Sequence, residues 1–136
     1  MDKSLIKRFA PIPVVTEEIG KKVLDAAYTV HSALGPGLLE SVYEACMAQK
    51  LRQQKVIVDT QVAMPVTFEG VQVETGLRLD LLVGNLVIIE LKSVETIIPL
   101  FEAQLLTYLK LTGLRLGYLI NFNVVHLKDG IKRMVN

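Results

Sequence analysis

Asp80, Glu90 and Lys92 are the residues of this sequence whose types and spacing most strongly suggest chemistry. Asp80 lies in one strand-like run, residues 77–83, and the other two lie in the next, residues 86–92. Side chains alternate along a strand, so Glu90 and Lys92 point to the same face. Charges in an apolar central strand are costly to bury without a partner or a metal. The pattern predicts a catalytic or metal site, with a purely structural Glu90–Lys92 pair as the alternative.

The connection between the two strands decides whether Asp80 and Glu90 can meet. A two-residue turn at residues 84–85 would leave Glu90 on the opposite face from Asp80, because a shift of one residue exchanges the faces of a strand. Convergence therefore requires an odd-length loop or a bulge between Val83 and Val87. We predict such a connection.

Two helices are predicted before these strands. Apolar residues recur at helical spacing over residues 16–34, and acids follow Thr16 in the first turn, so Thr16 is the expected N-cap. Gly35 and Pro36 end this helix, and a second helical pattern covers residues 38–54. Residues 1–15 are expected to form an extended lead-in, because prolines at positions 11 and 13 oppose a helix.

The rest of the chain predicts a sheet with one further helix. Residues 56–59, 61–68 and 71–75 alternate and are rich in β-branched side chains, which indicates strands in addition to the pair described above. A helix is expected over residues 100–111, followed by strands over residues 116–122 and 131–135. This order predicts one α+β (mixed α/β) domain over residues 16–136, with helices packed against a central mixed sheet.

Composition narrows the function classes. The 136 residues are enough for one domain, and 51% hydrophobic against 21% charged residues excludes a disordered chain. The net charge of +1 excludes a strongly basic coat for nucleic acid. A mean hydropathy of +0.40 is high for a small monomer, so we expect a buried partner surface, such as that of a homodimer.

The location expected from the sequence is the cytoplasm. A single cysteine, Cys46, excludes an intrachain disulfide and a cysteine-based zinc site, which fits a reducing compartment. No apolar run reaches the length of a membrane span, and prolines stand where the apolar part of a signal peptide would lie.

Asp80, nine intervening residues and Glu90-x-Lys92 resemble the catalytic signature of the PD-(D/E)XK nuclease superfamily, with Leu79 in place of its proline. Residues 37–43 also spell the motif GxxExxY. The chain is thereby similar, over residues 16–136, to the GxxExxY family of that superfamily. The resemblance implies a restriction-endonuclease-like core. It is carried by residues 34–43, 78–83, 89–92, 104–109 and 119–122.

The resemblance implies a Mg²⁺-dependent (or Mn²⁺-dependent) nuclease that hydrolyses phosphodiester bonds of DNA or RNA. Asp80, Glu90 and the Leu91 carbonyl would hold the metal through oxygen, the ligand atom Mg²⁺ prefers. Lys92 would orient the attacking water or stabilise the transition state. Glu40 would complete the metal or water shell, although an acid at a helix N-terminus is also favoured by the dipole alone. Glu44 is a possible substitute, and we expect it to be solvated.

Further contacts are implied on the later helix and strand. Gln104 and Tyr108 are four residues apart, so they share a helix face, and their spacing resembles a motif that contacts the site or the nucleic-acid backbone. The alternative is a half-buried Tyr108 with a structural Gln104. Phe101 stands where a polar residue is expected. Arg133 lies in a closing stretch that also resembles the family and is a candidate for binding nucleic acid.

A binding or assembly module of the same fold, catalytically silent and dimeric, is the alternative function. Near-neutral charge and high hydrophobicity favour it, whereas retention of three costly charges argues against it. The two histidines do not suggest a zinc pair: we expect His31 to be a hydrogen-bonded structural residue and His126 to be exposed in the last loop. Basic clusters such as the one containing Lys128 are interpreted as solvated faces.

Overall fold

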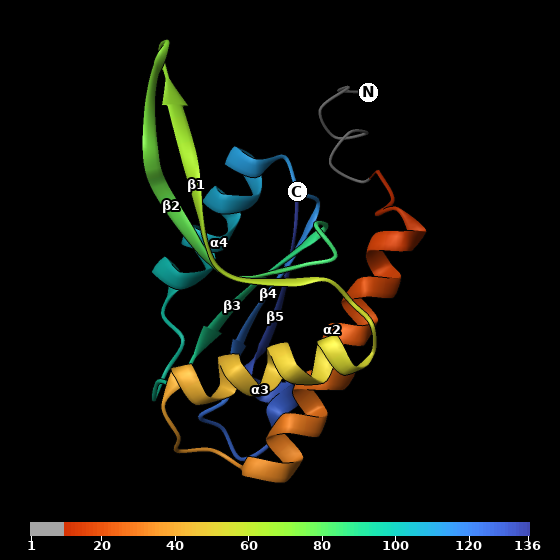
Figure 1. The fold of residues 1–136 in the computed structure, drawn as a ribbon. Helices are drawn as coiled ribbons and strands as arrows, with labels where there is room; N and C mark the ends of the chain where they lie inside the picture. The colour runs from red at the N-terminus through yellow and green to blue at the C-terminus, as the bar shows by residue number, and fades with distance from the viewer. Residues whose placement is uncertain (1–9) are drawn as a thin grey trace.

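One mixed sheet and three helices organise residues 10–136, which are the part of the chain that the structure, a computed structural model, describes (Figure 1). The predicted order of helix, helix, strands, helix, strand and strand is confirmed. In chain order the elements are α2 (Val14–Leu34), α3 (Glu40–Gln53), β1 (Val58–Phe68), β2 (Val71–Val83), β3 (Val87–Lys92), α4 (Pro99–Thr112), β4 (Leu116–Asn121), the 3-10 turn η1 (Leu127–Gly130) and β5 (Ile131–Val135).

The sheet follows chain order, β1-β2-β3-β4-β5. All neighbours are antiparallel except β3 and β4, which are parallel and are joined through α4. A parallel pair needs such a crossover, and the crossover helix covers one face of the sheet. The carboxyl ends of β3 and β4 therefore open at the same edge, where α3 passes (Figure 1).

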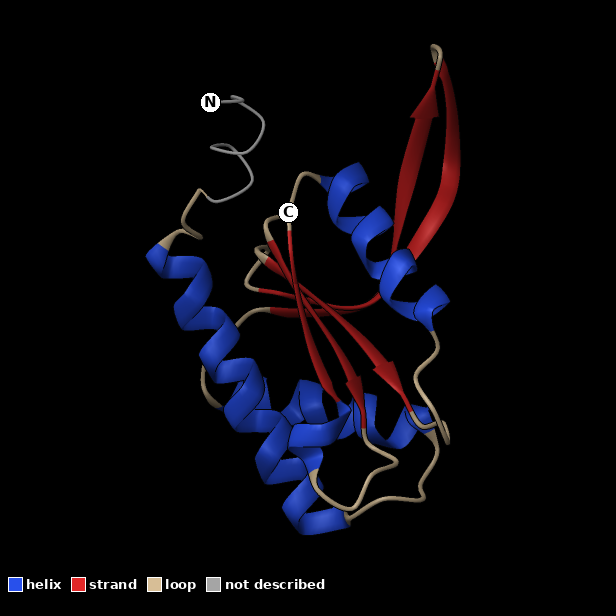
Figure 2. Ribbon diagram, turned by 180° about the vertical axis from the view of Figure 1, so that it is seen from behind, coloured by secondary structure: helices blue, strands red, loops and turns tan. Residues whose placement is uncertain are grey.

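The two faces of the sheet are covered by different helices (Figure 2). On one face α2 buries Val23, Ala26 and Val30 in the larger cluster, to which α3 also contributes. Their spacing of three and four residues is the apolar stripe predicted for this helix. On the other face α4 buries Leu105 and Leu109 against β2, β3 and β4 in a second cluster.

The connection between β2 and β3 has the odd length that the sequence analysis requires. Val83 pairs with Val87, so residues 84–86 form a three-residue loop whose first two residues have φ of 59° and 56°. The same register, continued towards the other ends of the two strands, places Asp80 opposite Glu90 on one face of the sheet. This prediction is confirmed.

The β1-β2 hairpin bends sharply along its length (Figure 1). Gln61 on β1 has a left-handed backbone (φ 51°), and the ladder pairs the residues on either side of it without pairing Gln61 itself. On β2, Leu81 packs in the α2 and α3 cluster, whereas Leu79 packs in the α4 cluster. Across the bend, β2 thus changes its packing partner from the cluster of α2 and α3 to the cluster of α4.

Beyond the bend the hairpin packs against α4, and its tip projects past the helices as an arm (Figure 2). The pairing register shifts near Gly76, where an added Cβ would collide with the side chain of Val66. Such an irregularity is typical of a bulge that bends a strand. Three apolar side chains of the arm are largely exposed: Phe68 (72%), Val71 (64%) and Val73 (53%).

Two local predictions differ from the structure. The first helix begins at Val14 and not at Thr16, which is 2% exposed inside the helix, so its hydroxyl does not cap the N-terminus. Pro13 precedes the first helical residue, where its fixed φ is tolerated. Val14 and Val15 are therefore helical rather than part of the extended lead-in expected over residues 1–15, whose first nine residues lie outside the described part.

The strands of the hairpin are longer than predicted. The expected breaks after Asp59 and Thr75 fall at the two irregularities of a continuous β1 and β2. In residues 10–136 no helix is long and apolar enough to cross a membrane.

Candidate metal centre

Asp80 and Glu90 are connected through backbone hydrogen bonds. The Asp80 amide donates to Oε1 of Glu90 (3.3 Å), and the Leu91 amide donates to Oδ2 of Asp80 (2.9 Å). Backbone pairing of β2 with β3 stops at the preceding pair, Leu81 with Ile89. β2 and β3 separate at this point. The Leu91 amide therefore donates to the carboxylate of Asp80 instead of to a backbone carbonyl of β2.

The backbone of Leu91 faces the same side as Asp80. The amide and the carbonyl of a strand residue point in the same direction across the ladder. Because the Leu91 amide points at Asp80, the Leu91 carbonyl is directed to that side as well. Two carboxylates and one carbonyl thus converge where β2 and β3 diverge.

Burial destabilises the ionised form of Glu90. Glu90 is 5% exposed, and burial, followed by the nearby charge of Asp80, raises its pKa to about 8. Lys92 acts in the opposite direction but has less effect. A bound cation would supply the compensating charge, and an all-oxygen donor set suits Mg²⁺ or Mn²⁺. The residues present therefore fit a hard divalent ion, although the described part of the chain holds no group of three or more His, Cys, Asp or Glu side chains able to hold a metal.

Lys92 is held by an aromatic ring and not by a carboxylate. Its Nζ lies 4.3 Å from the centre of the Phe101 ring on α4. Among residues 10–136 the single ion pair within 4.0 Å joins Arg133 to Glu17, so Lys92 forms none with Glu90 or Glu40. The ring attracts the ammonium through its quadrupole. The ring at position 101, where a polar residue was expected, thus holds the Lys92 ammonium, which still lowers the pKa of both Glu40 and Glu90.

Phe101→Leu is expected to release Lys92 and to lower the rate of any metal-dependent cleavage by about fivefold, which corresponds to the roughly 1 kcal/mol of such a contact. Phe101→Tyr keeps an aromatic face and should retain the wild-type rate. The measurement is kcat for both variants, with the Lys92 Nζ resonance followed by NMR. Equal rates for the leucine and tyrosine variants would show that the ring does not position Lys92.

Two acidic residues of α3, Glu40 and Glu44, also lie near the centre. Glu40 is the first residue of α3, and partial burial and the charge of Asp80 raise its pKa, whereas Lys92 lowers it. Glu44 follows one turn later and accepts a hydrogen bond from Nε2 of Gln61. Glu44 is therefore partly buried and bonded, not solvated as expected.

Gln61 is a site residue that was not predicted from the sequence. Its Nε2 also lies 3.5 Å from Oδ1 of Asp80, so the amide spans Glu44 and the metal-binding candidate. With Leu91 on Oδ2, both oxygens of Asp80 are contacted by donors. The local signal was the interruption of the strand pattern at residue 60, which marks the bend where the exposed Gln61 amide reaches Glu44 and Asp80.

The predicted residues of α4 divide into two groups. Tyr108 is half-buried, and burial, with the charges of Glu90 and Asp80, raises its pKa, which places its hydroxyl in the field of the centre. Gln104, one turn earlier, is exposed, and no hydrogen bond of the described residues joins it to either carboxylate.

The structure does not bring Arg133 to the centre. Its guanidinium pairs with Glu17 (2.8 Å) and donates to the hydroxyl of Tyr118 (3.0 Å). Tyr118 packs on the sheet face covered by α2, whereas Glu90 shares the α4 face with its strand neighbour Ile88. A role of Arg133 in binding nucleic acid stays a prediction.

Comparison with known proteins identifies the family. Searches of curated proteins and of solved structures found no match. A family model described as the PD-(D/E)XK nuclease superfamily matches residues 17–134, from the first turn of α2 into β5. The five-stranded mixed sheet flanked by three helices is the restriction-endonuclease-like α+β fold expected of such a chain. The protein belongs to the PD-(D/E)XK nuclease superfamily.

Proposed function

We propose that this protein is a Mg²⁺-dependent (or Mn²⁺-dependent) nuclease of the GxxExxY type that hydrolyses phosphodiester bonds in DNA or RNA. The observation that carries the proposal is the pairing of Asp80 with the buried Glu90 at the point where β2 leaves β3. Membership of a nuclease superfamily supports the reaction class. Residues 37–43, which include Glu40, supply the motif of the narrower family.

Asp80, Glu90 and the Leu91 carbonyl would hold the cation. When bound, it lowers the pKa of a water and neutralises charge on the phosphate. Lys92, held at the edge of the centre by Phe101, donates a hydrogen bond to the attacking water or to a phosphate oxygen.

Other side chains complete the proposed site. Glu40 would accept a hydrogen bond from a water in the centre, and the Tyr108 hydroxyl would donate to the phosphate. Gln104 is proposed to contact the nucleic-acid backbone one helical turn away. Gln61 keeps the Asp80 carboxylate oriented towards Glu90.

The test is a cleavage assay on single- and double-stranded DNA and RNA, with Mg²⁺, Mn²⁺ or EDTA. Cleavage that requires metal is expected for the wild type and is expected to be lost in Lys92→Met, which should still bind metal because Lys92 is not a ligand. Lys110→Met, an exposed lysine of α4, is the matched control. Metal binding by the wild type without cleavage of any substrate would contradict the proposed reaction.

An assembly module is the second candidate, and the projecting arm favours it. Phe68, Val71 and Val73 are exposed there, and the charged side chains of residues 61–76 are two glutamates, which disfavours contact with a polyanion. A protein partner, such as a second copy of the chain, suits this surface better than nucleic acid. Affinity for nucleic acid that falls steeply with salt supports the nuclease, and salt-independent association supports the module. A homodimer and a cytoplasmic location stay predictions.

A further inference from the structure

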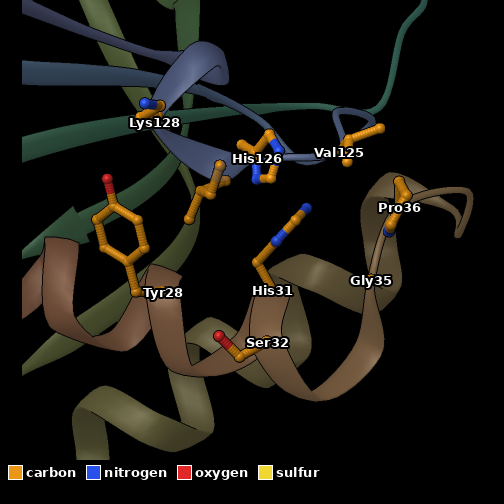
Figure 3. A pocket seen from close by; sticks show the side chains of 9 residues that line it. Tyr28, His31, Ser32, Gly35, Pro36, Val125, His126 and Lys128 are labelled. Atoms are coloured by element: carbon orange, nitrogen blue, oxygen red, sulfur yellow. The ribbon is translucent and has the colours of Figure 1, made fainter.

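A cavity of about 560 Å³ lies between the last turns of α2 and the segment that follows β4 (Figure 3). Tyr28 and His31 rise from α2 towards this segment, which contributes His126 and Lys128. None of these residues belongs to the candidate metal centre. The cavity lies on the α2 side of the sheet edge, whereas the metal centre lies between β2, β3 and α4.

Apart from His31, whose Nε2–H is bonded to the Val124 carbonyl, the polar side chains of the cavity can donate hydrogen bonds to a ligand, and no aspartate or glutamate lines it. His126 and Lys128 are exposed and can move to meet a ligand. Hydroxyl groups come from Tyr28 and Ser32. A lysine with imidazole and hydroxyl donors, free of competing carboxylates, is suited to a negatively charged ligand with several acceptor oxygens.

His31 is a buried residue that holds one side of this cavity in place through a hydrogen bond. The residue is 9% exposed, and its Nε2 donates to the Val124 carbonyl (2.8 Å), as expected for a structural histidine. Its ring also lies beside Phe122, with ring centres 6.3 Å apart. The hydrogen bond joins α2 to the segment after β4, so the two walls of the cavity keep their separation without a ligand.

The loop of residues 35–39, which joins α2 to α3, connects the cavity to the metal centre and is fixed by hydrogen bonds. Gly35 and Pro36 line the cavity, and Glu40 of the centre follows four residues after Pro36. The Tyr43 hydroxyl donates to the Gly35 carbonyl (2.7 Å), and Ser93, next to Lys92, donates to the carbonyl of Leu38 (2.6 Å). Residues 35–39 therefore connect the cavity to the first residue of α3, and hydrogen bonds fix them at both ends.

We propose that this cavity binds a phosphate group of a polynucleotide, one that is not the group attacked at the metal centre. Lys128 and His126 would contact its oxygens, and His31 would hold the wall against which it rests. The inference rests on the proposed function, because a polynucleotide substrate supplies the second phosphate.

The test uses Lys128→Met, with Lys132→Met as the matched control. Lys132 is exposed on β5 and pairs with Leu119, whose side chain packs in the α4 cluster on the other face of the sheet. Inorganic phosphate is titrated by calorimetry, and a fluorescent single-stranded oligonucleotide is titrated in EDTA, where it is not cleaved. Lys128→Met should weaken the affinity for phosphate and for the oligonucleotide by about tenfold each, the effect of one charged hydrogen bond. It should also reduce the dependence of oligonucleotide affinity on salt concentration by about one released ion.

Lys132→Met should leave phosphate binding unchanged, and His126→Gln should weaken it in the same direction as Lys128→Met. Equal effects of the two lysine variants on the affinity for inorganic phosphate would show nonspecific charge and overturn the inference. Phosphate binding that depends on Lys128 while oligonucleotide binding does not would overturn the assignment to a polynucleotide. Metal-dependent cleavage by a wild type that shows no Lys128-dependent binding would refute the cavity alone and leave the nuclease intact.

Discussion

Asp80→Asn is expected to lower the affinity for Mg²⁺ or Mn²⁺ and the cleavage rate by at least about 100-fold. Residues that merely orient metal ligands cost 10–100-fold when removed, so the loss of a ligand should cost at least as much. Asparagine keeps an oxygen that can accept the hydrogen bond now donated by the Leu91 amide. It removes the negative charge that helps to raise the pKa of Glu90. The variant should therefore fold, and its free energy of unfolding without metal should not fall.

Calorimetric titration of the metal and denaturation in EDTA measure the two effects separately. Asp59→Asn is the matched control, because Asp59 is an exposed residue of β1 and the substitution changes the charge equally. Unchanged metal affinity in folded Asp80→Asn would exclude Asp80 as a ligand. Equal losses in both variants would indicate an effect of net charge.

The position of Asp80 and Glu90 was predictable because it follows from local rules. Two strands, an alternating pattern and the parity of one loop determine whether the two carboxylates share a face. The three-residue connection over residues 84–86 meets that condition. The helical stripe of α2 and the stop at Gly35 were predictable for the same reason, since both depend on neighbours a few residues apart.

Other parts of the site depend on partners far apart in sequence. Gln61 reaches Asp80 because its backbone adopts φ 51°. The break in the strand pattern at residue 60 indicates a bend there, but it does not indicate which side chain the bend directs to Asp80. Arg133 pairs with Glu17, 116 residues away, so its position among the closing basic residues did not reveal that its charge is compensated. From the sequence, Phe101 was interpreted as the absence of a polar contact. The structure shows that its ring contacts the ammonium of Lys92, nine residues earlier in the chain.

The raised pKa of Glu90 has a second consequence, which is that metal binding and stability should depend on pH in opposite directions. Without metal, the folded protein keeps a proton on Glu90 up to a pKa of about 8, whereas an unperturbed glutamate loses it near 4.5. A metal must displace this proton. Its affinity should therefore rise by up to about tenfold per pH unit between about pH 5 and 8 and level off above.

The free energy of unfolding without metal should follow the opposite course. Between the two pKa values the folded state binds more protons than the unfolded state, so this contribution to stability is complete below about pH 4.5 and decreases as pH rises to about 8. The total change is a few kcal/mol, since each pKa unit corresponds to about 1.4 kcal/mol.

Glu90→Gln should abolish both pH dependences, because glutamine has no proton to lose. Urea denaturation in EDTA at several pH values measures the stability, and calorimetry in two buffers of different ionisation enthalpy counts the protons released on metal binding. About one proton is expected from the wild type below pH 7, and none from Asp80→Asn, which should not bind metal. A wild type that binds metal without proton release, or whose stability rises between pH 5 and 8 as much as that of Glu90→Gln, would show that Glu90 is already ionised. Its buried charge would then have to be compensated by Lys92 and not by a metal.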